Sequence, residues 1–212
     1  MTAPDPAALR AAAQVPADAP LPLVLHGQPV LHTPAAEVTA FDAALAALVE
    51  EMFTTMYAAP GVGLAAPQVG VGLRVFVYDV GRGRRGHVVN PVLERVPGEL
   101  QTDLEGCLSA PGLEYDTPRA LHARVTGVDV TGAPVVVEGE GLLARCLQHE
   151  VDHLDGMLYL DRLGGRTRKQ AAKDVRAADW HGDAHRVLTR ADVLEQEARR
   201  AAGDDDPDDD EL

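Results

Sequence analysis

The chain has 212 residues, a net charge of −14 and 46% apolar residues, which suits one globular domain with a sizeable core. No apolar run approaches the ~20 residues of a membrane helix, the N-terminus does not resemble a secretory signal, and an acidic chain without a basic stripe argues against DNA or RNA as the main partner. Only two cysteines are present, Cys107 and Cys146, so a disulfide-stapled secreted fold is excluded and a cytoplasmic location is expected.

The first quarter of the chain divides into an arm and a helix. Residues 1–22 are rich in Ala and Pro without a period, which predicts a flexible N-terminal arm. Residues 38–58 carry apolar side chains at three- and four-residue spacing, which predicts a helix with one apolar face. Thr39 and Asp42 are both suitable N-cap residues for this helix.

Strands are predicted in the middle of the chain. The β-rich runs are residues 73–79, 87–90, 92–96, 120–130 and 133–138. Pro91 separates the second run from the third, and turn residues join the last two runs into a predicted hairpin. The polar stretch 97–119 is long for a loop inside a compact domain, and such loops are usually functional.

The last third returns to helical spacing. Residues 141–154 are predicted to form a helix that stops at Gly156, and residues 184–200 a further helix. Residues 201–212 are predicted to be a disordered acidic tail, which leaves 23–200 as the folded domain. The order of elements indicates an α+β fold, with mostly antiparallel strands packed around the helix at 141–154.

That helix carries the strongest motif, His149-Glu150-Val-Asp-His153. Histidines four residues apart lie on one face of a helix and can bind one metal ion, with Glu150 placed to act on a water. The alternative is a helix with two surface histidines beside acids.

The third ligand is not given by the motif. One protease pattern needs a histidine at the position of Tyr159, and another needs a glutamate that is missing between residues 154 and 194. Asp161 and Asp174 have no motif around them. Cys107, in the polar stretch, offers a thiolate that suits a borderline divalent metal, or is a buried loop cysteine. Cys146 lies on the apolar run of the helix and is expected to pack or to line a pocket.

A glycine-rich segment runs from residue 61 to 70, Gly-Val-Gly-Leu-Ala-Ala-Pro-Gln-Val-Gly. It is either a tight loop between a helix and a strand, or a place where the backbone approaches a ligand and Gln68 presents an amide. Taken with the sequences Glu-Gly-Cys-Leu-Ser at 105–109 and His-Glu-Val-Asp-His at 149–153, in this order, it resembles the peptide deformylase family. The resemblance covers about residues 29–163.

The resemblance implies an enzyme that removes the formyl group from N-terminal formylmethionine of nascent polypeptides and releases formate. It implies that Cys107, His149 and His153 bind one divalent metal ion, natively Fe(II), for which Zn, Ni or Co can substitute. A water completes the site. Glu150 then acts as general base and acid, and the developing oxyanion accepts hydrogen bonds from the Gln68 amide and the Leu108 backbone N–H.

A second group of residues is expected to bind the substrate. Val62, Leu142 and Cys146 are candidates for an apolar slot for the methionine side chain, and Gly63 would let the substrate backbone lie alongside. Glu105 is expected to orient a neighbour, with Arg119 as its structural partner. Arg145, one turn before His149, either lines the slot with its stem while its guanidinium reaches solvent, or is a surface arginine.

Three other readings stay open. A metallopeptidase would share the helix motif, but it needs a third metal ligand downstream of the motif, and this sequence lacks one there. A degenerate paralogue would bind peptide without catalysis, although Glu150, Gln68 and Cys107 are intact. A structural metal site would need four protein ligands.

The expected partners are N-formyl-methionyl peptides and, transiently, the ribosome, with no DNA and no membrane.

Overall fold

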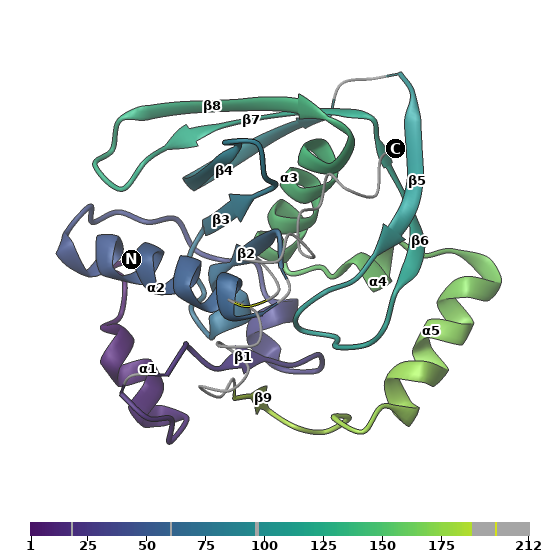
Figure 1. Cartoon of the computed structure of the whole chain (residues 1–212), viewed down its shortest axis with the longest axis horizontal. Coiled ribbons are helices and arrows are strands. Elements are labelled where there is room, and N and C mark those ends of the chain that lie inside the picture. Colours follow the sequence, from purple (N-terminus) through teal and green to yellow (C-terminus); the bar gives the residue numbers. More distant parts are fainter. Residues whose placement is uncertain (18, 60, 96–97, 188–197, 199–212) are drawn as a thin grey trace.

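The computed structural model describes residues 1–17, 19–59, 61–95, 98–187 and 198. A five-stranded antiparallel sheet lies at its centre (Figure 1). Its strands, in spatial order, are β2 (Gly63–Ala65), β3 (Val75–Asp79), β4 (Arg85–Arg95), β7 (His122–Val128) and β8 (Pro134–Glu140). Two antiparallel pairs lie outside the sheet, β5 (Leu100–Glu105) with β6 (Tyr115–Ala120) and β1 (Leu23–Val24) with β9 (His185–Arg186). The helices are α1 (Pro6–Ala12), α2 (Ala43–Ala58), α3 (Gly141–Leu154), α4 (Tyr159–Arg162) and α5 (Gly165–Ala177), with 3₁₀ turns at Pro29–His32 and Ala66–Val69.

Alternation along β3 places a helix on each face of the sheet. Val75 and Val77 are buried in the cluster that contains α2, whereas Phe76 and Tyr78 are buried in the cluster that contains α3. Successive side chains of a strand point to opposite faces, so one strand serves both cores. The predicted fold class, α+β with mostly antiparallel strands around the helix at 141–154, is confirmed.

The helix predicted over 38–58 begins five residues later, at Ala43. Asp42, one of the two predicted caps, accepts hydrogen bonds from the backbone N–H groups of Ala44 and Leu45, each at 3.1 Å. Val38 does not join the helix because its N–H donates to the side-chain oxygen of Asn90, at 2.8 Å. A tertiary contact to β4 therefore overrides the local apolar spacing.

The prediction of two strands split by Pro91 was wrong, because β4 is one strand from Arg85 to Arg95. Its pairing with β7 shifts register between Val89 and Val92, as in a β-bulge. Asn90 takes a left-handed φ of 51° there, a conformation that asparagine tolerates. The proline thus sits in the irregularity and does not end the strand.

The polar stretch 97–119, expected to be one long loop, contains the β5–β6 hairpin and a shorter loop between its strands. The strands were missed because the buried side chains of this hairpin include Glu105, Thr117 and Arg119, while Leu100 and Leu104 are 72% and 63% exposed. The apolar alternation that identifies a half-buried strand is therefore absent.

The two ends also differ from expectation. Within residues 1–22, α1 packs on α2, and the buried Arg10 donates to the Ala19 carbonyl and pairs with Glu51. At 184–200, β9 replaces the start of the predicted helix, while residues 188–197 and 199–200 of that helix and the tail 201–212 lie outside the described residues. Helix α5 was not predicted because only Ala171 and Val175 on it are buried.

No helix among the described residues is long and apolar enough to cross a membrane.

Candidate metal centre

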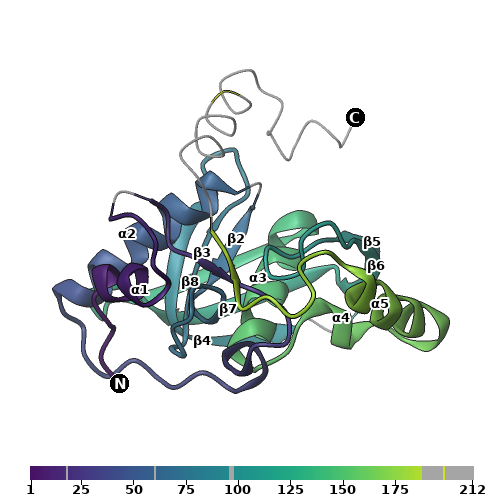
Figure 2. The ribbon, with the colours of Figure 1, turned by 90° about the horizontal axis from the view of Figure 1, so that it is seen from below.

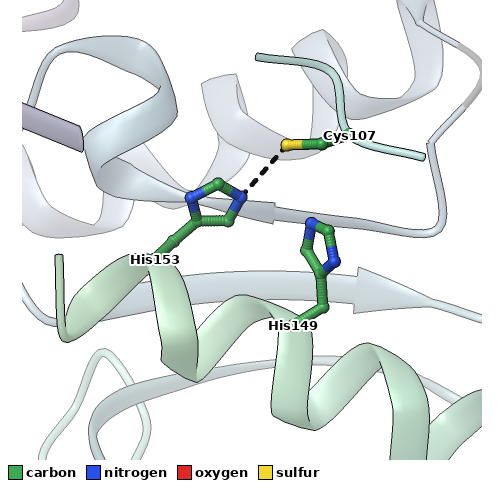
Figure 3. A group of neighbouring side chains, drawn as sticks. All are labelled: Cys107, His149 and His153. Atoms are coloured by element: carbon green, nitrogen blue, oxygen red, sulfur yellow. Dashed lines mark hydrogen bonds between the residues drawn. The ribbon is translucent and has the colours of Figure 1, made fainter. Parts of the chain in front are cut away.

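Helix α3 turns one face to the sheet and another to a cavity. Leu143, Leu147 and Val151 are buried against the sheet. Gly141 begins the helix with a φ of 57°, which glycine adopts without a Cβ penalty. His149 and His153 lie one turn apart on another face, so both rings point toward the same loop (Figure 3).

That loop carries Cys107, two residues after the end of β5. Its far side is held by hydrogen bonds from the Trp180 indole to the Pro111 carbonyl, at 2.9 Å, and from the Tyr159 hydroxyl to the Leu113 carbonyl, at 2.6 Å. Helix α4 and the segment after α5 therefore hold the loop that presents the cysteine.

Cys107, His149 and His153 fit a divalent metal ion. The Cys107 Sγ is 3.2 Å from the His153 Nε2 (Figure 3), and one ligand atom from each of the three residues lies within 4.8 Å of the others. His153 is fully buried. One thiolate and two imidazoles form a donor set typical of tetrahedral divalent sites that keep a fourth position open. Cys107 thus lies where a third ligand to the two histidines of the helix motif would stand.

Glu105 orients His149 through a buried ionic network. Its Oε2 lies 3.2 Å from the His149 Nδ1, which leaves Nε2 free to face the cluster. Arg119 donates to both Glu105 oxygens at 2.8 Å, which is the predicted Glu105–Arg119 pair. Burial alone would raise the pKa of Glu105, but the hydrogen bonds from Arg119 and His149 outweigh it and lower the pKa to about 2. Glu105 is therefore a carboxylate at neutral pH.

The network extends to residues that the motifs did not single out. Asp152, fully buried on α3, accepts a hydrogen bond from the Arg119 Nη1 at 2.5 Å and pairs with Arg162 of α4. Its place directly before His153 in the motif was the only sequence signal for this role. The network fastens α3, β5, β6 and α4 together beside the candidate ligands.

Glu150 is buried against β2 with no hydrogen-bond partner for its Oε2 among the described residues. Desolvation raises the pKa of Glu150 to about 7. A Cβ built on Gly63 would lie 2.3 Å from the Glu150 Oε1 and 2.9 Å from the Cys146 Sγ. The glycine at position 63 thus leaves the space that the carboxylate occupies.

Gln68 and Leu108 present hydrogen-bond donors beside the cluster. The Gln68 Oε1 accepts from the Ala65 N–H at 2.8 Å, which turns its Nε2 toward the Cys107 Sγ, 3.6 Å away, and the Ser109 Oγ, 3.5 Å away. The N–H of Leu108 donates to no acceptor within the described part of the chain. The Leu108 N–H is therefore available to a bound molecule, and the two contacts of the Gln68 Nε2 are long enough for a better acceptor to replace them.

A cavity of about 330 Å³ joins these groups. Its lining includes the three residues predicted for the apolar slot, Val62, Leu142 and Cys146, and the glycine predicted to lie beside the substrate backbone, Gly63. It also includes Gln68, Cys107, Leu108, His149 and Glu150. Burial, with Glu150 nearby, raises the pKa of the Cys146 thiol, and its Sγ lies 3.5 Å from the Val62 carbonyl oxygen. Leu104 and Arg186 also line the cavity, and they were not predicted because β5 and β9 were not predicted.

Arg145 differs from both expectations for it. Its side chain is neither a surface arginine nor one whose guanidinium reaches solvent, because the residue is 6% exposed. Arg145 does line the cavity, while its guanidinium binds Glu105 and Asp103 of β5.

A model of the polypeptide deformylase family matches residues 20–169. The chain belongs to this family. The deformylase is 54% identical over 168 residues to the peptide deformylase of Acidothermus cellulolyticus, over 79% of this chain and 92% of that one. It is 56% identical over 164 residues to peptide deformylase 2 of Streptomyces coelicolor, with 76% and 92% covered. The crystal structure of a peptide deformylase from Synechococcus elongatus in complex with actinonin superposes with a TM-score of 0.71 at 39% identity, over 78% of this chain and 93% of that one. Membership of this family decides against the metallopeptidase reading.

Proposed function

We propose that this peptide deformylase removes the formyl group from N-terminal formylmethionine of new polypeptides, and that Cys107, His149 and His153 hold its ion. The observation that carries the proposal is the convergence of these three donors, within 4.8 Å of one another, in a cavity that also contains Glu150 and Gln68. A divalent ion, Fe(II) natively with Zn, Ni or Co as substitutes, would supply Lewis-acid chemistry and make a water reactive near neutral pH.

Glu150 is the proposed general base and acid. It is buried, it lines the cavity, and its Oε2 has no hydrogen-bond partner in the described residues. We assign it to accept the proton of the attacking water and to deliver that proton to the departing amine of methionine. Formate and a free N-terminus are the products.

Gln68 and Leu108 are the proposed donors to the developing oxyanion. The Gln68 Nε2 is directed by the contact of its Oε1 with Ala65, at 2.8 Å, so it needs no reorganisation during the reaction. The Leu108 N–H follows Cys107 directly in the loop. Donors held in place before the charge develops contribute on the order of 10²–10³ in rate.

The methionine side chain is proposed to lie between β2 and α3. Val62 and Gly63 line one side of the cavity, and Leu142 and Cys146 line it from the helix that also carries His149. The thiol of Cys146 stays protonated because burial raises its pKa, so it serves as an apolar wall of the slot.

Formate release tests the proposal. Anaerobically prepared protein should release formate from formyl-Met-Ala-Ser and leave an acetylated peptide of the same sequence intact. Glu150→Gln is nearly isosteric but cannot accept the proton, so it should keep the ion and lose at least ~10² in rate. Cleavage of an internal peptide bond, or normal turnover by a metal-replete Glu150→Gln protein, would contradict the assignment.

We also propose that the deformylase works in the cytoplasm and meets its substrate at the ribosome, through α5. This helix lies at the edge of the molecule, on the opposite side from α1 (Figure 2). Its exposed side chains include five cations, Arg166, Arg168, Lys169, Lys173 and Arg176, in a chain of net charge −14. Its one acid, Asp174, is hydrogen-bonded to Tyr115 at 2.5 Å. Phosphate backbones attract such clusters in a salt-dependent way.

Co-sedimentation with ribosomes tests this second proposal. Lys169→Glu with Lys173→Glu should weaken ribosome binding, and the wild-type binding should fall with added salt. The rate on a short formyl peptide should not change. Unchanged, salt-insensitive sedimentation of the double variant would contradict the assignment to α5.

A further inference from the structure

Arg145 joins the helix that carries the histidines to the hairpin that carries the cysteine. Its Nη1 donates to the Glu105 Oε1 at 2.9 Å and to the Thr117 carbonyl at 3.1 Å, and its Nη2 donates to the Asp103 Oδ2 at 2.7 Å. One guanidinium on α3 thus contacts both β5 and β6. The contact lies one turn before His149 on the helix.

Glu105 accepts from two guanidinium groups that approach from different elements. Its Oε1 receives N–H groups of Arg119 and Arg145, and its Oε2 receives Arg119 and faces the His149 Nδ1. Arg119 comes from β6 and is shared with Asp152. Arg145 comes from α3 itself, so it ties the carboxylate directly to the helix of His149.

The burial of this cluster makes the second guanidinium consequential. The side chains of Glu105 and Arg145 are 3% and 7% exposed, whereas that of Asp103 is 67% exposed. Without Arg145, Asp103 can turn to water, but Glu105 stays buried with one cation fewer. A surface ion pair contributes little, whereas removing one partner of a buried pair leaves an uncompensated charge.

We propose that Arg145 is a positioning residue that fixes Glu105 against α3 and so sets the relative placement of His149 and Cys107. Glu105 ends β5 and Cys107 follows it by two residues, while His149 follows Arg145 by four. The contact between Arg145 and Glu105 therefore lies where α3, which carries the two histidines, meets β5, which leads to Cys107. The inference rests on the proposed function, because it concerns the ligands assigned there.

The test replaces Arg145 by Met, which keeps an apolar stem along the cavity and removes every hydrogen bond of the guanidinium. Wild-type and Arg145→Met proteins are loaded with cobalt(II) without oxygen. The absorption of the bound ion reports its thiolate ligation and geometry, and a chelator gives the rate of release. We expect a changed spectrum and release at least ~10-fold faster, the usual scale for loss of a residue that orients a metal ligand.

Arg10→Met is the matched control. Arg10 is also a buried arginine, 8% exposed, with an ion pair to Glu51, but it joins α1 to α2 and not the β5–β6 hairpin to α3 (Figure 2). This control should lower the melting temperature and leave both the cobalt spectrum and the release rate unchanged. Arg145→Lys should fall between wild type and Arg145→Met, because one ammonium cannot span Asp103, Thr117 and Glu105 together.

The outcomes separate this inference from the proposed function. If wild-type protein binds no cobalt through a thiolate, the proposed metal site itself fails. If wild type binds cobalt and Arg145→Met keeps the parent spectrum and release rate while only its melting temperature falls, Arg145 is merely structural and the inference is overturned. Should Arg145→Met not fold, Arg145→Lys decides alone, and a wild-type release rate in that variant overturns the inference.

Discussion

Gly63→Ala should disable the enzyme by displacing Glu150. The added Cβ would lie 2.3 Å from the Glu150 Oε1 and 2.8 Å from its Cδ, whereas ordinary contact begins at 3.4 Å, so the carboxylate must retreat by about 1 Å. Overpacking of this size typically costs about 1–3 kcal/mol of folding stability. A misplacement of about 1 Å at a catalytic group can cost 10²-fold in rate. We therefore expect kcat for formate release to fall ~10²-fold while the metal content is unchanged.

Gly72→Ala is the control for this prediction, because nothing lies within 4 Å of the Cβ that it adds. The loss should also be non-additive: in a Glu150→Gln background, Gly63→Ala should lower the remaining rate little further, since the base is already gone. A rise in KM with kcat unchanged would refute the reasoning, and would show instead that Gly63 makes room for the substrate backbone.

Three further outcomes follow from the site. In Cys107→Ser, elemental analysis should show loss of the metal, and formate release should be abolished, whereas Cys146→Ser should retain the metal. Equal loss of metal in both variants would contradict the assignment of Cys107 as the sulfur ligand. Trp180→Phe removes the N–H that holds the Pro111 carbonyl at 2.9 Å, so urea unfolding should show a loss of about 1 kcal/mol, and an unchanged midpoint would mean that this contact does not stabilise the loop. Leu142→Trp should narrow the slot and raise KM for formyl-Met peptides more than for formyl-Ala peptides; equal effects would place the methionine elsewhere.

The parts of the fold that the sequence predicted well are those in which apolar periodicity reports burial. Helix α3 runs over the predicted residues 141–154, because Leu143, Leu147 and Val151 recur on the face that the sheet covers. The pairing of β7 with β8 also agrees with the predicted hairpin. In both elements local preference and tertiary packing favour the same structure.

The β5–β6 hairpin shows why the rest could not be predicted. Its buried positions are occupied by charges such as Glu105 and Arg119, which are stable only because their partners come from distant elements. From a single sequence, each charged residue is predicted to be exposed to solvent, because local spacing does not reveal a partner from a distant element. The same applies to Arg145, whose burial depends on Asp103 and Glu105, about forty residues earlier.

Metal reconstitution coupled to formate release shows whether an ion held by Cys107, His149 and His153 is required for catalysis. Metal-free protein is titrated anaerobically with Fe(II), and bound metal and formate release from formyl-Met-Ala-Ser are measured in the same samples. We expect activity to rise with bound metal and to saturate at one ion per chain, and we expect Cys107→Ser neither to bind the ion tightly nor to gain activity, as a metal-dependent mechanism requires. Full formate release by metal-free protein, or by a Cys107→Ser protein without bound metal, would contradict it.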